Sequence, residues 1–122
     1  MRTLAKLALS VLVLSGCGAQ AAPAQLPKEC SEVPVMIGAH LSKFSSLAEK
    51  PKELKADIAA AVTEAEIKAA GISDPTIKQA LQGFADQLKA IEVGKGRKSI
   101  EATQAAIKSG TDTIEQVAKV CQ

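Results

Sequence analysis

The chain has 122 residues, 47 % of them hydrophobic, and a formal net charge of +2 at pH 7. Subtracting Arg2 and Lys6 from the 15 basic residues leaves 13 basic against 13 acidic residues from Cys17 onward. No net positive charge then remains to attract nucleic acid, and with no Trp or Tyr and only two Phe there is little on which bases could stack. We therefore expect one domain that does not bind nucleic acid.

Residues 1–16 are typical of a secretory signal peptide. Arg2 and Lys6 supply a positive segment, residues 7–14 are apolar except for Ser10, and small residues follow. A helix that spans a bilayer needs about 20 apolar residues. This apolar run is therefore too short for a lasting transmembrane anchor.

Four residues at the end of that run, Leu14-Ser15-Gly16-Cys17, resemble the lipobox of bacterial lipoproteins. The resemblance implies cleavage after Gly16 and acylation of Cys17, which becomes the first residue of the mature chain. It further implies a cell-envelope protein held in a lipid membrane, with the outer membrane favoured because Gly18 rather than Asp follows the cysteine. The resemblance covers the signal region alone and implies nothing about the domain that follows.

A second cleavage pattern leaves an alternative open. Ala19-Gln20-Ala21 fits ordinary signal-peptidase cleavage, which would discard Cys17 and release a secreted or periplasmic protein that begins at Ala22. If Cys17 is retained, residues 17–29 read as a flexible tether, because Gly, Ala, Gln and Pro dominate them.

Beyond the tether, apolar residues recur at intervals of three and four, which predicts helices. The first helix runs to Lys50-Pro51, because a residue before proline is disfavoured in helical conformation. The second begins at Pro51 and ends near Gly71, which we expect to form a left-handed cap. Their predicted core stripes are Val33, Ile37, His40, Phe44 and Leu47, then Leu54, Ile58, Ala61, Val62 and Ala65.

Asp74-Pro75 predicts the start of a third helix, with an acceptor at the N-cap and proline in the first turn. This helix should end at Gly94, and a fourth should begin among Gly96, Arg97 and Lys98. Their predicted core stripes are Ile77, Leu81, Phe84, Leu88 and Ile91, then Ile100, Ile107, Ile114 and Cys121.

Gly110 falls in the middle of the predicted fourth helix. The seven-residue repeat passes through it, which favours one helix, and a glycine there would let a neighbouring backbone come close. Two shorter helices, the second capped by Thr111 or Asp112, are the alternative.

Cys30 and Cys121 are the remaining cysteines, and export would place them in an oxidising compartment where we expect a disulfide. Short connections favour an all-α, up-down-up-down four-helix bundle over residues 30–122. With four helices, Cys30 and Cys121 lie at the same end, whereas three helices would separate them. The predicted disulfide and the predicted helix count therefore support each other.

No catalytic, cofactor or metal site is recognised in the sequence. His40 is the only histidine, and we interpret it as a buried or boundary structural residue, because Met36 and His40 share one helix and cannot flank one haem iron. Glu64 and Glu66 should point to different faces, and no Glu-x-x-His motif is present. Residues 94–99 lack the glycine and preceding strand of a phosphate-binding loop.

Three functions remain open. The preferred one is an envelope lipoprotein whose bundle is a structural or protein-interaction module, with an unidentified protein partner. The second is a small-ligand carrier with a cavity bordered by Phe44, Phe84 and His40. The third, an enzyme, is not favoured, because no nucleophile has a visible base.

Overall fold

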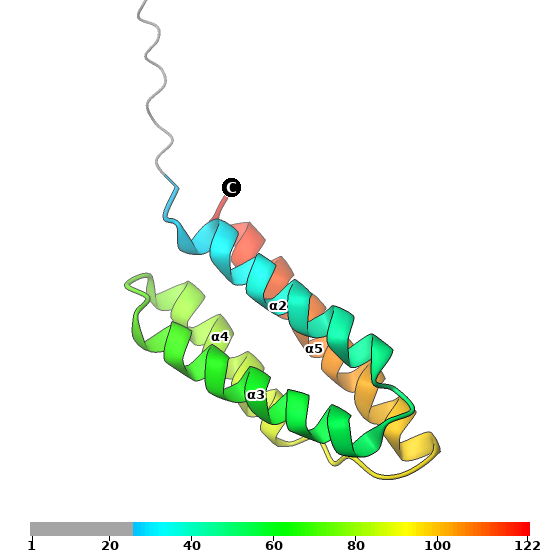
Figure 1. Cartoon of the computed structure of the whole chain (residues 1–122). Helices are drawn as coiled ribbons and strands as arrows, with labels where there is room; N and C mark the ends of the chain where they lie inside the picture. Colours follow the sequence, from blue (N-terminus) through cyan, green and yellow to red (C-terminus); the bar gives the residue numbers. More distant parts are fainter. Residues whose placement is uncertain (1–25) are drawn as a thin grey trace, which may run out of the picture.

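The computed structural model describes residues 26–122, so the features assigned to residues 1–25 lie outside it. This part of the chain forms four helices and no strand: α2 (Glu29–Ser46), α3 (Pro51–Ala70), α4 (Pro75–Lys89) and α5 (Arg97–Val120). Successive helices run in opposite directions, and the described chain begins and ends at the same end of the bundle (Figure 1). The predicted up-down-up-down four-helix bundle is confirmed.

The helix starts follow the predicted signals. Pro51 is the first residue of α3, where its missing N–H leaves no hydrogen bond unmade. At the start of α4, the Asp74 carboxylate accepts hydrogen bonds from the backbone N–H groups of Thr76 (2.9 Å) and Ile77 (3.0 Å). Local sequence chemistry therefore sets where these two helices begin.

Two predicted helix ends and one predicted cap conformation are wrong. The helix α2 ends at Ser46 rather than at Lys50, and α4 ends at Lys89 rather than at Gly94. Gly71 has φ −96°, so α3 ends without the predicted left-handed cap. At the ends of α2 and α4, the backbone N–H groups of Leu47 and Ala90 donate hydrogen bonds to carbonyl groups of the last turn. These bonds need no glycine.

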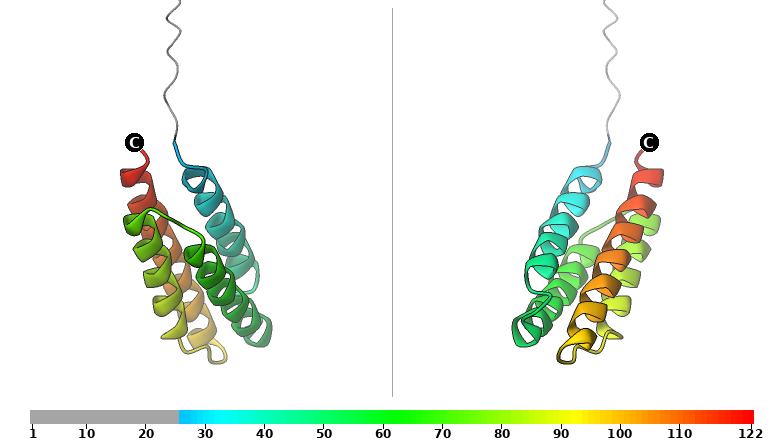
Figure 2. Two further views of the ribbon diagram at one scale, coloured as in Figure 1. Left: turned by 90° about the vertical axis from the view of Figure 1, so that its left-hand side faces the viewer. Right: turned by 90° about the vertical axis from the view of Figure 1, so that its right-hand side faces the viewer.

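The core consists mainly of the predicted stripes of α2, α3 and α4, around which the four helices lie side by side (Figure 2). Predicted residues Leu47, Val62 and Ile91 are only partly buried at its edge. The contact between α3 and α4 is the most extensive in the bundle, whereas that between α2 and α3 is the least extensive of any neighbouring pair. The largest fully buried side chains include Phe44, Phe84, Ile37, Leu54, Ile77, Leu81 and Leu88.

The predicted core face of α5 is wrong. The observed buried positions are shifted by about one residue from the predicted ones. Ile100 is 43 % exposed, and Ile107, Ile114 and Cys121 are only partly buried. The buried face instead carries small side chains: Ser99, Ala102, Thr103, Ala106, Ser109, Gly110, Thr113 and Val117. Small side chains let α5 approach its neighbours closely, while the larger isoleucines cover the edge of the contact.

The buried hydroxyl groups on α5 all have acceptors. Thr103 and Thr113 donate to backbone carbonyl groups one turn earlier in α5. Ser109 donates to the side-chain oxygen of Gln87 on α4. Ser99 Oγ donates to the carbonyl oxygen of Ala48 at 2.6 Å, which ties the start of α5 to the connection between α2 and α3. The cost of burying these polar groups is thereby offset.

Gly110 lies inside α5, which is one continuous helix as predicted. A Cβ atom at this position would lie 2.4 Å from Leu41 Cδ2 and 3.1 Å from Ile37 Cγ2. A neighbour does approach closely at Gly110, but the groups that come close are side chains of α2 rather than the predicted backbone.

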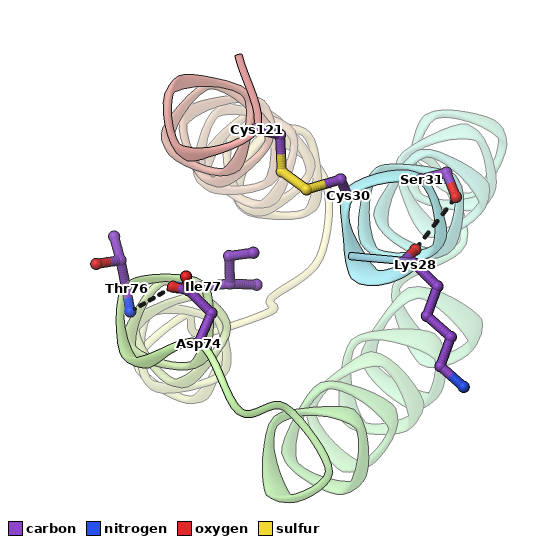
Figure 3. The surroundings of a disulfide bond; sticks show 7 residues. All are labelled: Lys28, Cys30, Ser31, Asp74, Thr76, Ile77 and Cys121. Carbon is purple, nitrogen blue, oxygen red and sulfur yellow. Dashed lines mark hydrogen bonds between the residues drawn. A yellow bond between two sulfur atoms is a disulfide. The ribbon is translucent and has the colours of Figure 1, made fainter. Parts of the chain in front are cut away.

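Cys30 and Cys121 form the predicted disulfide. It joins the first turn of α2 to the residue after α5, with Cα atoms 5.8 Å apart and a sequence separation of 91. Figure 3 shows this bond at the end of the bundle where Asp74 caps α4. The first and last helices are therefore covalently joined at the end of the bundle where the described chain begins.

Candidate functional site

His40 lies on α2 facing α3 and is 9 % exposed. Its Nδ1 atom is 3.4 Å from Asp57 Oδ2, and its Nε2 atom is 2.5 Å from Glu64 Oε1. Lys43, one turn further along α2, places its Nζ atom 3.6 Å from Asp57 Oδ1. These four residues form a polar link across the loosest seam of the bundle.

The sequence positions this link through helical periodicity. Asp57 and Glu64 are seven residues apart on α3, so they lie two turns apart on the same side of the helix and bracket the imidazole ring. Both ring nitrogens are then engaged by carboxylates. A neutral ring can donate to only one of them, and no ring nitrogen is left for a substrate or a metal ion. The arrangement fits the structural role expected for His40.

An exposed apolar stripe runs along the outside of α3. Ala56, Ala60, Thr63, Ile67 and Ala70 are all exposed, at spacings of four, three, four and three. Ile67 is 70 % exposed, among the highest values for a large apolar residue in the described chain. At about 100° per residue these positions point away from the buried stripe, so α3 has two opposite apolar faces. We call these five residues the outer stripe.

A surface depression of about 670 Å³ lies between the outer stripe and α2. Its apolar walls are Ala39, Ala60 and Ile67, and its polar wall is the His40 link. A second depression of about 250 Å³ lies further towards the disulfide end, between Met36 and Ile67. Phe44 and Phe84 are fully or almost fully buried and line neither depression. Both of these depressions lie between α2 and α3, and another of about 520 Å³ lies between α3 and α4.

Ion pairs connect the helices around these depressions. Lys68 on α3 hydrogen-bonds Glu32 on α2, which holds the pKa of the Glu32 carboxyl below its usual value. On the opposite side of α3, Lys89 Nζ lies 2.5 Å from Glu66 Oε2, and this hydrogen bond raises the pKa of Lys89. Glu64 and Glu66 therefore do serve different neighbours, as predicted.

The other predicted site residues are placed as follows. Cys17 and the cleavage position at Gly16 lie outside the described residues, whereas Cys30 and Cys121 are joined. Within residues 26–122, no group of three or more His, Cys, Asp or Glu side chains is arranged to hold a metal ion. In the same range, no helix is long and apolar enough to cross a membrane.

Sequence reasoning missed both features of the α2–α3 seam. Asp57 sits among the buried positions Leu54, Ile58 and Ala61, and a carboxylate in that place signals a partner from another helix. The outer stripe has the same four-three spacing as the core stripes. The sequence pattern did not distinguish its alanines from those of an ordinary solvent-exposed helix face.

The described structure is a disulfide-linked bundle with one apolar helix face left uncovered. A protein family described as a domain of unknown function (DUF8711) matches residues 25–122. The chain belongs to this family. No curated protein and no solved structure matches it.

Proposed function

We propose that the chain is an envelope lipoprotein, anchored through acylated Cys17, whose helical bundle is a structural or protein-interaction module. The observation that carries the interaction role is the outer stripe of α3, because a helix with two apolar faces has one face to bury in its own core and another available for a partner. The lipid anchor rests on the resemblance of Leu14-Ser15-Gly16-Cys17 to a lipobox.

The position of the disulfide supports the structural part of this proposal. The described chain begins beside the bond between Cys30 and Cys121, which ties α2 to α5. A force transmitted from a membrane anchor would act first on the start of α2, and the bond passes that force to the last helix. The disulfide would thus hold α2 in place at the end of the bundle nearest the membrane anchor.

The alternative of a small-ligand carrier has less support. Phe44 and Phe84 are packed into the core rather than around a cavity, and the depressions between α2 and α3 are open to solvent. Catalysis has less support still, because carboxylates occupy both ring nitrogens of His40.

The anchor is tested by cell fractionation and mass spectrometry of the mature protein, comparing the wild type with Cys17→Ser. We expect wild-type protein in the membrane fraction, beginning at residue 17 and carrying acyl chains, and the variant in the soluble fraction without them. Ser15→Ala is the matched control, because it keeps a small residue before the cleavage position. A wild-type mature protein that begins at Ala22 without acyl chains would overturn the anchor.

A further inference from the structure

The side chains of the outer stripe differ in size along α3. The only large apolar side chain of the stripe, Ile67, lies near the end of α3, whereas Ala56 and Ala60 lie nearer the start. If two copies of this stripe meet with the helices antiparallel, each Ile67 packs against the alanines of the other copy. If they meet in parallel, Ile67 meets Ile67 and the alanines face one another across a gap. Large-on-small packing therefore favours the antiparallel arrangement.

The depression between α2 and α3 fits the same arrangement. It is bordered by two small residues, Ala60 and Ala39 on α2, and also by Ile67 of the same copy and by the His40 link. An antiparallel second copy centred between Ala60 and Thr63 brings its own Ile67 towards Ala56 and Ala60, next to this depression. The protruding side chain and the space that receives it are thus on one surface, as a twofold-symmetric contact requires.

The charges on α3 are also arranged for antiparallel contact. The exposed charges near the start of α3 are Lys52, Glu53 and Lys55, mostly basic, and those near its end are Glu64 and Glu66, both acidic. Glu49 and Lys50, just before the helix, carry opposite charges. The acidic end keeps more carboxylates than amines when the partners Glu32 and Lys89 are included. Lys50, Lys52 and Lys55 form no ion pair within the described residues. Antiparallel helices bring opposite charges together, and parallel helices bring like charges together.

We propose that the outer stripe of α3 is the contact surface of a twofold-symmetric dimer, in which the α3 helices of two copies pack antiparallel. This rests on the interaction role proposed above and names a second copy of the chain as the partner. The two tethers then leave from opposite ends of the dimer. A lipid-anchored dimer would lie with its helices along the membrane surface, and its twofold axis would be perpendicular to the membrane.

Cross-linking of introduced cysteines in intact cells tests the contact on the full chain. Thr63→Cys lies at the centre of the stripe, and we expect a short bismaleimide to yield a species of twice the protein's mass. Gln104→Cys, at an exposed position on α5, is the matched control and should stay monomeric. Wild-type protein treated in parallel reports any reactive thiol at Cys17.

A second substitution asks whether the apolar contact causes the cross-link. Adding Ile67→Lys to Thr63→Cys should lower the cross-linked fraction about tenfold, because a loss of about 1.4 kcal/mol of association free energy has that effect. Ile67 is mostly exposed, so this variant should fold, and retention of the Cys30–Cys121 bond and of the circular dichroism spectrum checks it.

The relative orientation of the two α3 helices is tested by producing two different cysteine variants in the same cells. Cells that produce Ala56→Cys together with Ile67→Cys should yield more cross-linked product than cells that produce either variant alone. The reverse result overturns the antiparallel arrangement. The dimer itself is overturned if Thr63→Cys remains monomeric, if Ile67→Lys changes nothing, or if the only product has the mass of a different partner. Membrane fractionation of the same cells reports the anchor separately, so failure of the anchor is distinguishable from failure of the dimer.

Discussion

The absence of a side chain at Gly110 sets how closely α5 approaches α2. We expect Gly110→Ala to lower the free energy of unfolding by about 1 kcal/mol, measured by urea denaturation. The added methyl group would meet Leu41 and Ile37, and such overpacking costs about 1–3 kcal/mol. That cost exceeds the gain of up to about 1 kcal/mol that alanine brings to a helix interior.

Gly83 supplies the matched control for this substitution. It lies inside α4, and a Cβ atom there would meet nothing within 4 Å. Gly83→Ala should therefore raise the free energy of unfolding by about 0.5–1 kcal/mol. Equal effects of the two substitutions would show that α2 does not restrict position 110.

The His40 link shows how far single residues could be interpreted from the sequence. Its place on the apolar stripe of α2 predicted a buried histidine, because burial follows from local periodicity. Its partners could not be assigned in that way. Asp57 and Glu64 belong to another helix, and their contact with His40 depends on how α2 and α3 pack.

At the scale of the element, the start of α4 depends on one side chain. The Asp74 carboxylate accepts from two N–H groups that have no acceptor within the helix. We expect Asp74→Ala to lower the free energy of unfolding by about 1 kcal/mol in denaturation experiments. Asp74→Ser keeps an acceptor and should restore most of the loss. A serine variant as unstable as the alanine variant would contradict the capping role.

The sequence predicted the core faces of α2, α3 and α4 because large apolar residues mark them. It failed for α5, whose buried face is marked by small residues. Ser99, Thr103 and Gly110 do not appear apolar in a hydropathy pattern, and they are buried only because neighbouring helices supply acceptors and close contacts. The isoleucine repeat at Ile100, Ile107 and Ile114 was real but lies beside the contact rather than within it.

At the scale of the molecule, the helix count and the cysteine positions together predicted the topology. Four antiparallel helices return the chain to the end at which it started, and only that arrangement brings Cys30 to Cys121. The uncovered face of α3 was not predicted, because a solvated alanine surface and a contact surface share one sequence pattern. The placement of Ile67 beside the α2–α3 depression and the charges on α3 support the proposed contact surface.

The disulfide should provide a large share of the bundle's stability. Its cysteines are 91 residues apart in sequence, and closing a loop of about that length restricts the unfolded chain enough to stabilise the fold by about 4 kcal/mol. We expect Cys30→Ser/Cys121→Ser to lose approximately this amount in urea denaturation. Without the bond, the paired ends of α2 and α5 should also exchange amide hydrogens faster than the Ser99 end, where the Ala48 contact remains.

Reduction of the wild-type protein provides the control for that prediction. A reductant should lower the stability of the wild type to that of the double variant and leave the double variant unchanged, because both then have the same unfolded state. Equal stability of the oxidised wild type and the double variant would contradict the role of the bond. Fast exchange at both ends of the bundle would instead show that the disulfide stabilises the whole bundle without protecting the end that carries the tether.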